Sequence, residues 1–440
     1  MYNDTIKLLN LEQFKLNILK LDVSKINNVL YCYITLERKE TICPLCGGKN
    51  YNIKDYQTKK ITHSISNNNP CIIVYKARRY KCKHCNHVFY EHNPFSLKSN
   101  KNSTYTIYTV LEKLKSHTKT FTDVANDLFL STSTVIRIFD QYVDFKRPTL
   151  PQIICFDEIY FSRKLKDKYA FVMADFSKNK ILDIQHSRKK NKLSKYFSDI
   201  SKAERDNVKY IVIDMWDTYL DLAYIYFYNA KIAIDSFHVI KHLNQAIISI
   251  RIKIMKLYDK DTDTLQSNDM YYYMLKKFHY FFTRNFDDIY SGPILIGKIN
   301  SKWDKHEIRK YLLSINTDLD YAYYLKERYR EFNLTAEYET CDEEFDELIN
   351  EFLDSHLEEF RDFGQLLLRW KPYIKNSFLR VNGRRLSNGP IEGINSRIKT
   401  IIKSANGFKN FRRFRNRTIY SINKNVPIKY KPIKINNIKK

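Results

Sequence analysis

Apolar residues recur with two different periods along the chain and divide it into segments. Between residues 104 and 142 they follow the three-to-four spacing of amphipathic helices, with Val110, Val124 and Val135 on the inward faces. From residue 152 onward, short apolar runs alternate with helical segments. The pattern predicts a helical unit followed by an α/β domain.

Two short helices are predicted in the helical unit, because each begins at a capping residue. Thr120 has Asp123 three positions later, a variant of the capping box, and Ser131 precedes the second helix. The turn between them predicts a helix-turn-helix DNA-binding domain, although two amphipathic helices could also simply pack on the preceding segment. In a DNA-binding domain the polar face of the second helix would reach base edges and phosphates in a major groove. That face consists of Ser133, Thr134, Arg137 and Gln141.

Three consecutive strands are predicted after residue 152, followed by helix, strand, helix and strand. This order gives the mixed sheet of an RNase H-like fold, whose first three strands form an antiparallel meander. Two of the strands run directly into carboxylates, Asp157 and Asp214. Such acids are costly at the ends of core strands unless they are paired or bind a metal, although an Asp there also often caps a helix. The pair is therefore a candidate site for Mg²⁺, which prefers hard oxygen ligands.

The last acidic residue of the chain is Glu392, which lies in a segment rich in lysine and arginine. Pro390 suits a first helical turn, so Glu392 is expected near a helix N-terminus. A lone carboxylate in such a segment is either a solvated ion-pair partner or a metal ligand beside a polyanion. The surrounding cations would hold DNA phosphates. This set consists of Arg384, Arg385, Arg397, Lys399, Arg412 and Arg413.

Four of the eight cysteines form two C-x-x-C pairs, Cys43 with Cys46 and Cys82 with Cys85. Two such pairs supply the four thiolates of a tetrahedral structural zinc site. The stretch before the second pair alternates like a strand, as it does in a zinc ribbon. The spacing therefore predicts a zinc ribbon that holds a structural Zn²⁺.

The formal net charge of the 440-residue chain is +26, which favours a polyanionic partner. Nucleic acid is the first expectation and an anionic membrane surface the second, although an AT-rich coding sequence would also raise the lysine content. No apolar run approaches the roughly 20 residues of a membrane span, and the N-terminus lacks the basic-then-apolar pattern of a signal peptide. The chain is therefore expected to be intracellular.

A long insertion is predicted in the α/β domain, because residue 392 lies 178 positions after residue 214. Within it, residues 305–331 and 341–370 are predicted to be long helices, the second strongly acidic. The predicted fold is multidomain α/β, with an RNase H-like core interrupted by an all-α insertion. Its parts are an N-terminal segment (1–40), the zinc ribbon (41–95), the helix-turn-helix domain (100–147), the first part of the core (150–258), the helical insertion (259–370), the last part of the core (371–420) and a basic tail (421–440).

Several motifs resemble, in order, those of the ISL-three family of bacterial insertion-sequence transposases. They are Cys-Pro-Leu-Cys-Gly from Cys43, Arg-Tyr-Lys-Cys-Lys-His-Cys up to Cys85, Phe-Asp-Glu-Ile around Asp157, Ile-Asp-Met-Trp around Asp214, Ile-Asp-Ser-Phe-His-Val-Ile-Lys from Ile234, Ser-Asn-Gly-Pro-Ile-Glu-Gly-Ile-Asn around Glu392, and Gly-Phe-Lys-Asn-Phe from Gly407. The resemblance implies a DDE transposase whose triad, Asp157, Asp214 and Glu392, binds Mg²⁺ or Mn²⁺. It also implies accessory roles for Asp235 and His238, which match an acid-x-x-His motif of related transposases.

The function implied by the resemblance is DNA transposition in the bacterial cytoplasm, with association to the nucleoid when DNA is bound. The protein would bind the terminal inverted repeats of its own element, cleave a strand and join it to target DNA. Bringing two ends together would suit a homodimer. Two other classes stay open: a non-catalytic DNA-binding protein, such as a silenced copy that acts as a repressor, and an RNA-handling nuclease. The nuclease would not explain the zinc and helical modules.

Overall fold

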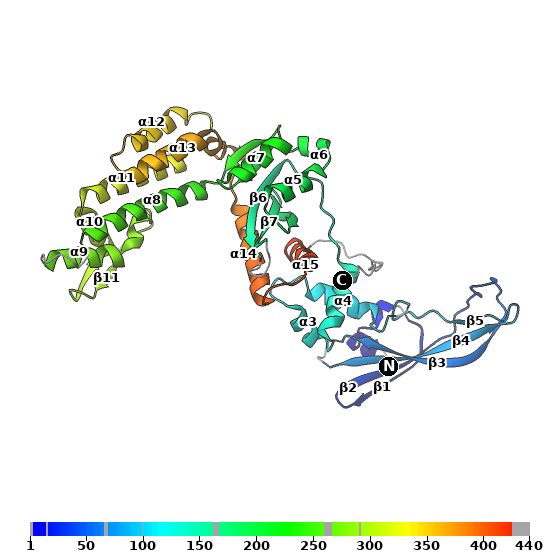
Figure 1. The fold of residues 1–440 in the computed structure, drawn as a ribbon. Coiled ribbons are helices and arrows are strands. Elements are labelled where there is room, and N and C mark those ends of the chain that lie inside the picture. The colour runs from blue at the N-terminus through cyan, green and yellow to red at the C-terminus, as the bar shows by residue number, and fades with distance from the viewer. Residues whose placement is uncertain are drawn as a thin grey trace. The chain divides into compact units, whose positions relative to one another are not determined.

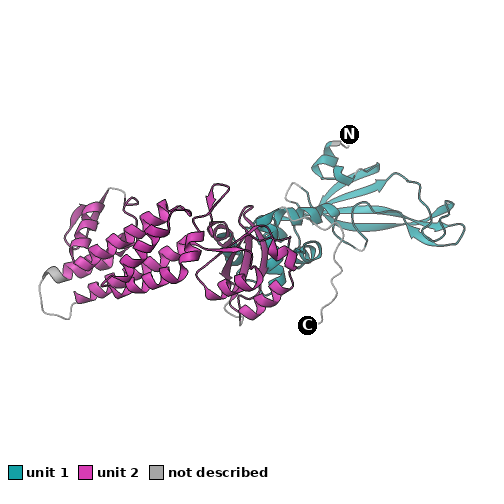
Figure 2. Cartoon of the chain, turned by 90° about the horizontal axis from the view of Figure 1, so that it is seen from above, with its two compact units in different colours: residues 1–147, 396–440 teal, residues 148–395 magenta. Residues whose placement is uncertain are grey.

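The computed structural model describes residues 3–14, 16–65, 69–98, 100–161, 167–258, 266–289 and 292–424. The chain forms two compact units, which Figure 2 shows in separate colours. Unit 1 comprises residues 1–147 and 396–440, and unit 2 comprises residues 148–395. Helix α14 (Gly389–Ser404) begins in unit 2, and its residues from Ser396 onward belong to unit 1. Of the basic tail expected at the end of the chain, residues 425–440 lie outside the described part.

A five-stranded sheet forms one part of unit 1 (Figure 1). Its order is β1-β2-β4-β3, and β5 also pairs with β4. Strands β2 and β4 are parallel, and the other pairs are antiparallel. The first two strands thus join the expected N-terminal segment to the zinc-ribbon strands in a single sheet. The elements are α1 (Asn3–Leu8), the 3-10 helix η1 (Glu12–Phe14), β1 (Ile18–Ile26), β2 (Val29–Leu36), β3 (Tyr51–His63), β4 (Cys71–Cys82) and β5 (Val88–Tyr90).

Four helices build the other part of unit 1, three from the middle of the chain and one from near its end. They are α2 (Thr104–Lys113), α3 (Phe121–Asp127), α4 (Thr132–Tyr142) and α15 (Phe411–Asn423). The predicted caps are confirmed, since the Thr120 hydroxyl accepts from the Asp123 N–H and the Ser131 hydroxyl accepts from the Thr134 N–H. The apolar faces of α2, α3 and α4 share one core with Tyr420 of α15. The sequence alone assigns α15 to the last part of the α/β core. In the structure its buried face packs in the helical core of unit 1.

Arg417 fixes the packing of α15 in this group. Its side chain is buried, and its guanidinium donates to the carbonyls of Leu114, Ser116 and Lys119, which follow the end of α2. Burial lowers the pKa of Arg417 to about 10. Carbonyls at a helix C-terminus lack partners within the helix and carry the negative end of its dipole. The buried cation of Arg417 therefore satisfies the Leu114 carbonyl at the end of α2 and two carbonyls of the connection to α3.

Acidification is expected to destabilise unit 1 through His63. This side chain is only 2% exposed, and its ring nitrogens contact Ser103 Oγ (2.8 Å) and the Leu9 carbonyl (2.7 Å). Burial lowers the pKa of His63 to about 4, whereas the unfolded chain takes up the proton near pH ~6.5. The folded state therefore favours the neutral ring. The stabilisation is complete above about pH 6.5 and is lost as the pH falls towards 4. The free energy of unfolding lost over this range is about 3 kcal/mol.

The measurement for His63 is denaturant unfolding of the full chain as a function of pH, with hydrogen exchange in β3 reporting on unit 1. His63→Gln is the matched control, because an amide can replace both hydrogen bonds but does not titrate. We expect the variant to be less stable at neutral pH and to lose less stability on acidification. Equally steep losses in both proteins would assign the effect to another group.

Unit 2 contains a second five-stranded sheet, with the order β10-β9-β6-β7-β8. Strands β6, β7 and β8 form the predicted antiparallel meander, and β9 and β10 continue the sheet in parallel with β6. The result is a mixed α/β sheet, as predicted. Its elements are β6 (Ile153–Tyr160), β7 (Tyr169–Asp175), β8 (Lys180–Gln185), α5 (Lys190–Ser198), α6 (Lys202–Asp206), β9 (Tyr210–Ile213), α7 (Asp217–Tyr226) and β10 (Lys231–Ile234).

The segment after β10 is mainly helical, and α8 packs against α11 and α13 in Figure 1. Buried residues of the sheet and of these helices form one continuous core. The insertion therefore shares the core of the α/β domain. Its elements are α8 (Ser236–Leu257), α9 (Gln266–Lys277), the 3-10 helix η2 (His279–Phe282), β11 (Pro293–Ile296), β12 (Ser301–Asp304), α10 (Lys305–Ser314), α11 (Thr317–Thr335), α12 (Asp342–Leu353), α13 (Glu358–Asn376), β13 (Arg380–Val381) and β14 (Arg384–Arg385).

Two predictions for the insertion were wrong in detail. It is not all-α, because β11 and β12 pair as an antiparallel hairpin whose turn includes Asn300 at a φ of +49°. Each predicted long helix is also divided in two. The first is broken where the Asn316 side chain accepts from the Asp318 N–H and so caps a new helix. A polar capping residue inside a continuous helical pattern looks like an ordinary surface residue in the sequence, so the break was not predicted.

Three acidic residues of α12 form ion pairs with basic residues of the neighbouring helices α11 and α13. Lys375 pairs with Asp342, and Lys371 pairs with Asp346. Arg328 on α11 pairs with Glu351 in the same way. Part of the acidic stretch is thus paired within unit 2, and two lysines that precede Glu392 in the sequence take part in these ion pairs.

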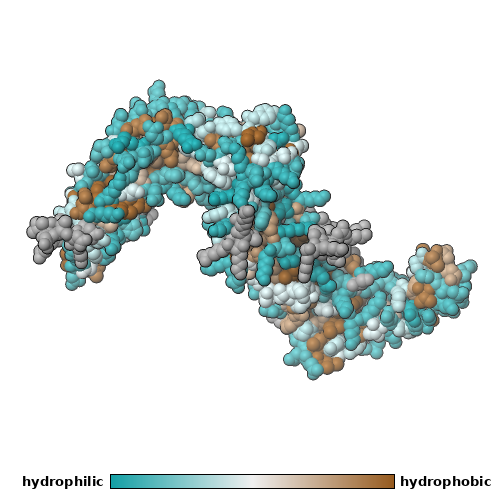
Figure 3. All heavy atoms as spheres, viewed as in Figure 1, coloured by the Kyte–Doolittle hydropathy of each residue, from teal (hydrophilic) through white to brown (hydrophobic). Residues whose placement is uncertain are grey.

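No helix in the described ranges is both long and apolar enough to cross a membrane. On the face seen in Figure 3, hydrophilic side chains cover most of both units and apolar ones gather in small separate patches.

Candidate functional site

The four predicted zinc ligands lie together where β4 ends. The Sγ atoms of Cys43 and Cys85 are 3.6 Å apart, as are those of Cys46 and Cys82. All four sulfurs lie within 4.8 Å of one another. A tetrahedral site with Zn–S bonds of about 2.3 Å places its sulfurs roughly 3.8 Å apart. The cysteines therefore fit a structural zinc ion.

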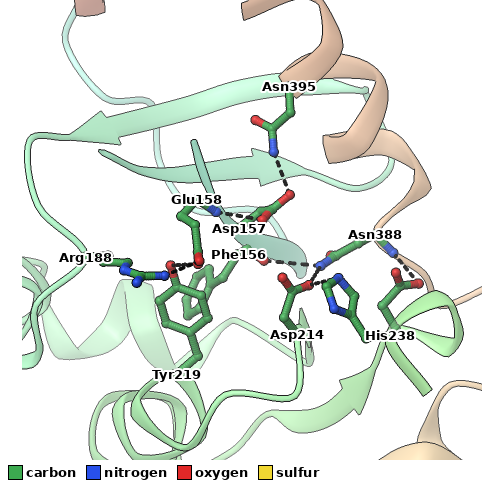
Figure 4. A network of polar contacts seen from close by, with 10 residues as sticks. Phe156, Asp157, Glu158, Arg188, Asp214, Tyr219, His238, Asn388 and Asn395 are labelled. Atoms are coloured by element: carbon green, nitrogen blue, oxygen red, sulfur yellow. Dashed lines mark hydrogen bonds and ion pairs between the residues drawn. The ribbon is translucent and has the colours of Figure 1, made fainter. Parts of the chain in front are cut away.

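Asp157 and Asp214 lie at the same level of two neighbouring parallel strands (Figure 4). Cys155 of β6 pairs with Val212 of β9, and each aspartate follows two positions later. Residues two apart along a strand face the same side of the sheet. Oxygen atoms of the two carboxylates lie within 4.8 Å of each other. The parallel register thus brings together two acids that are distant in sequence.

Within the described ranges, a histidine is the one basic side chain that pairs with these two acids. Among the described residues, no lysine or arginine forms an ion pair with Asp157 or Asp214, and Asp214 accepts from His238 Nε2 at 2.9 Å. Burial, followed by the charge of Asp214, raises the pKa of Asp157 to about 7. Burial opposes charging of His238, but its hydrogen bond to Asp214 raises its pKa overall. Hard oxygen donors with uncompensated charge fit a divalent cation.

Glu158 is the third acid of this group, and reasoning from the sequence did not single it out. One of its oxygens lies within 4.8 Å of oxygens of both Asp157 and Asp214. Its carboxylate is ion-paired with Arg188 and accepts from the Tyr219 hydroxyl at 3.0 Å. The charge of Glu158 is therefore already balanced within the protein. Successive residues of a strand face opposite sides, so spacing gave no reason to combine it with Asp157.

Helix α14 approaches the acids through two asparagines, one on each side of Glu392 in sequence. The Asn388 amide donates to Asp214 at 2.9 Å, and the Asn395 amide donates to Asp157 at 2.5 Å. Positions 388, 392 and 395 follow the spacing of one helix face. Glu392 therefore lies between two residues that contact the aspartates.

Glu392 itself is exposed and does not lie within 4.8 Å of both aspartates. Burial raises the pKa of Asp235 to about 6, and the charge of Glu392 contributes to this rise. The structure thus brings Asp157 and Asp214 together and places Glu392 nearby, but it does not assemble the expected triad as one tight group.

The two predicted accessory residues both border this site. His238 contacts Asp214 directly, whereas Asp235 is 2% exposed and accepts from the main-chain N–H of Asn388 at 3.1 Å. Through Asn388, Asp235 supports the start of α14. Asn388 and Asn395 were missed by reasoning from the sequence, although their spacing from Glu392 would have revealed a shared helix face.

The predicted DNA-binding residues lie at several places. Those on α4 form its exposed or half-buried outer side, and they are Ser133, Thr134, Arg137 and Gln141. Arg413 on α15 pairs with Asp140 of α4, and Arg412 pairs with Asp144. These two arginines therefore serve the packing of α15 on α4 and do not present uncompensated charge.

Arg385 also has a structural role in this protein. Its guanidinium donates to the carbonyls of Asn333 and Ala336 at the end of α11, and burial lowers its pKa. Arg384, by contrast, is exposed and lies over the Phe176 ring at 5.1 Å. On α14, Lys399 is exposed and Arg397 is half-buried.

A groove of about 800 Å³ in unit 1 is lined by β3, the end of β5 and the segment up to the start of α2. It carries four lysines that form no ion pair with any described residue. These are Lys59, Lys60, Lys98 and Lys101. Glu91 is the one acid among the described lining residues, and it pairs with Arg78. The groove therefore has a net positive charge.

These features define a multidomain α/β protein with a four-cysteine zinc ribbon and an acidic site in its second sheet. Residues 154–418 match the model of the DDE transposases of the ISL3 (ISL-three) group, described as a transposase. Residues 39–85 match the zinc finger of the transposases IS204, IS1001, IS1096 and IS1165. Because the first match covers more than half of the chain, the protein belongs to the ISL3 family of insertion-sequence transposases. No curated protein matches it.

Proposed function

We propose that this ISL3-family protein is an active DDE transposase, which cleaves DNA at the ends of its own insertion sequence and transfers the freed strand to target DNA. The observation that carries the proposal is the closeness of Asp157 and Asp214, two half-buried acids whose oxygens lie within 4.8 Å of each other and which have no lysine or arginine partner among the described residues. The order of the sheet, a meander followed by two parallel strands, supports an RNase H-like core.

In this proposal Asp157, Asp214 and Glu392 hold Mg²⁺ or Mn²⁺. Divalent cations bound there would supply Lewis acidity for phosphodiester hydrolysis and transfer. His238 orients the Asp214 carboxylate through its hydrogen bond. Glu392 is exposed on the helix face that contacts the aspartates, so rotation of its side chain would complete the set.

DNA recognition is assigned to unit 1. Helices α3 and α4 contact each other across a short turn. We assign them the role of a helix-turn-helix, in which the polar outer side of α4 would read the terminal inverted repeats. The zinc ribbon would orient the duplex, and Arg384, Arg397 and Lys399 would hold DNA phosphates. A homodimer would hold the two ends of the element at once.

The test of this function is incubation of the purified protein with labelled terminal repeats and Mg²⁺ or Mn²⁺, with nicks mapped at nucleotide resolution. We expect a nick at the element boundary that leaves a 3′-OH and requires the metal. Binding of the repeats with no nick under either metal would instead indicate a DNA-binding protein without catalytic activity.

The lysine-lined groove of unit 1 is expected to contact DNA phosphates. Replacing its four lysines by Ala should weaken binding to repeat and unrelated duplexes to a similar degree, since phosphate contacts carry no sequence information. The slope of log affinity against log salt should also become shallower by about three to four, because each lost phosphate contact contributes about 0.9. Fluorescence anisotropy over a range of salt concentrations measures both effects.

The matched control for the groove replaces four exposed lysines of the helical segment of unit 2. They are Lys256, Lys276, Lys302 and Lys310. This variant changes the net charge by the same amount as the groove variant. It should keep most of the salt dependence of DNA affinity. Equal losses in the two variants would mean that total charge, and not the groove, determines the affinity.

A further inference from the structure

The contacts of Asn395 leave one of its polar atoms unexplained. Its amide NH₂ donates to Asp157, but its Oδ1 atom is buried and has no hydrogen-bond partner among the described residues. The residue is only 6% exposed. Buried carbonyl oxygens normally accept a hydrogen bond. An unpaired one beside an acidic site therefore calls for a partner, either a hydrogen-bond donor or a cation.

Asn388 has a similar orphaned oxygen but is held more firmly. Its NH₂ donates both to Asp214 and to the Phe156 carbonyl at 3.2 Å, so both hydrogens are used. Turning this amide over would break two hydrogen bonds. Turning the amide of Asn395 over would break only the bond to Asp157.

Rotation of the Asn395 amide by a half turn exchanges Nδ2 and Oδ1 with little change of shape. In the absence of a cation, that rotation would bring a carbonyl oxygen against the Asp157 carboxylate and would be unfavourable. With a cation on Asp157, the same rotation would present a hard oxygen to it, and asparagine carbonyls are suitable ligands for such ions. The orphaned oxygen would then gain a partner.

We propose that Asn395 is a switchable metal ligand, which donates to Asp157 in the metal-free protein and turns its Oδ1 to the divalent cation when that cation binds. The inference rests on the proposed function and adds a fourth protein ligand to it. One face of α14 would then contribute Glu392 and Asn395, which are three residues apart, to the same site. Metal binding and the seating of α14 on the sheet would be coupled.

The test measures Mn²⁺ binding to the zinc-loaded full chain without DNA, by calorimetry and by the electron paramagnetic resonance of free Mn²⁺. Asn395→Ala should lower the Mn²⁺ affinity by about tenfold or more. Asn395→Asp should restore or exceed the wild-type affinity, because a carboxylate oxygen replaces the carbonyl oxygen at the ion. Asn376→Ala is the matched control, since it removes an amide of unit 2 that donates only to the Ile232 carbonyl.

The aspartate variant separates a ligand from a residue that merely positions Asp157. If Asn395→Asp bound Mn²⁺ as weakly as Asn395→Ala, an oxygen donor at this position would not reach the cation, which would overturn the proposal. Unchanged affinity in Asn395→Ala would overturn it as well. Failure of the underlying function is distinguishable, because wild type and Asp157→Asn would then bind Mn²⁺ equally.

Discussion

Replacement of Asp157 or Asp214 by Asn is expected to abolish metal-dependent cleavage of element ends, with a loss in rate of at least about a thousandfold. The substitution keeps the shape of each side chain but removes the charge that holds the cation. A cation that stabilises the transition state by several kcal/mol accounts for a loss of this size, since each ~1.4 kcal/mol is a factor of ten. Cleavage of labelled ends is measured alongside binding, which should remain within a few fold of wild type.

The identity of the third acid is tested by comparing Glu392→Gln with Glu158→Gln. Glu392 has the position on α14 expected of a ligand, whereas the carboxylate of Glu158 is engaged by Arg188 and Tyr219. We expect Glu392→Gln to match the loss in the aspartate variants and Glu158→Gln to retain cleavage within about tenfold, since it loses mainly a partly buried ion pair. The reverse result would assign the third position to Glu158, whose oxygen lies within 4.8 Å of oxygens of both aspartates.

The parts of this structure that sequence predicts best depend on residues close together in the chain. The caps at Thr120 and Ser131 need only a side chain and an N–H three residues later. The zinc knuckles likewise depend on the two-residue spacing within each cysteine pair. The aspartates were found because each directly follows a short run of apolar residues, and parallel pairing of β6 with β9 then brings them to one level.

The parts that sequence could not supply depend on contacts between distant segments. Asn388 and Asn395 are ordinary polar residues until α14 is placed against the ends of β6 and β9. Arg417 is one arginine among many until the segment between α2 and α3 offers it three carbonyls. The contacts of Arg385 could not be predicted for the same reason, since its guanidinium donates to backbone carbonyls at the end of α11. Composition shows that a chain is basic but not which cations are already engaged.

Removal of zinc is expected to unfold one end of the unit 1 sheet and to abolish recognition of the repeats. The knuckles are supported by a small core of their own, made of Cys43, Tyr51, Tyr80, Cys82 and Phe89. A core of this size cannot hold the segment without the metal, whose binding contributes about 10 kcal/mol or more to folding in comparable sites. The remainder of the sheet has a separate and larger core, so it should stay folded. Hydrogen exchange should therefore increase around the knuckles and much less in β1 and β2.

Cys82→Ser provides the same test without a chelator, and Cys32→Ser is its matched control. Cys32 is equally buried in the same sheet, but its Sγ faces that of Cys71 at 3.5 Å and lies outside the zinc cluster. We expect Cys82→Ser to lose bound zinc and repeat binding, whereas Cys32→Ser should cost only about 1–2 kcal/mol and keep one zinc per chain. Repeat binding by a zinc-free Cys82→Ser protein would place recognition in the helices of unit 1 alone. Because unit 2 has its own core, Mn²⁺ binding at Asp157 and Asp214 should survive in both variants.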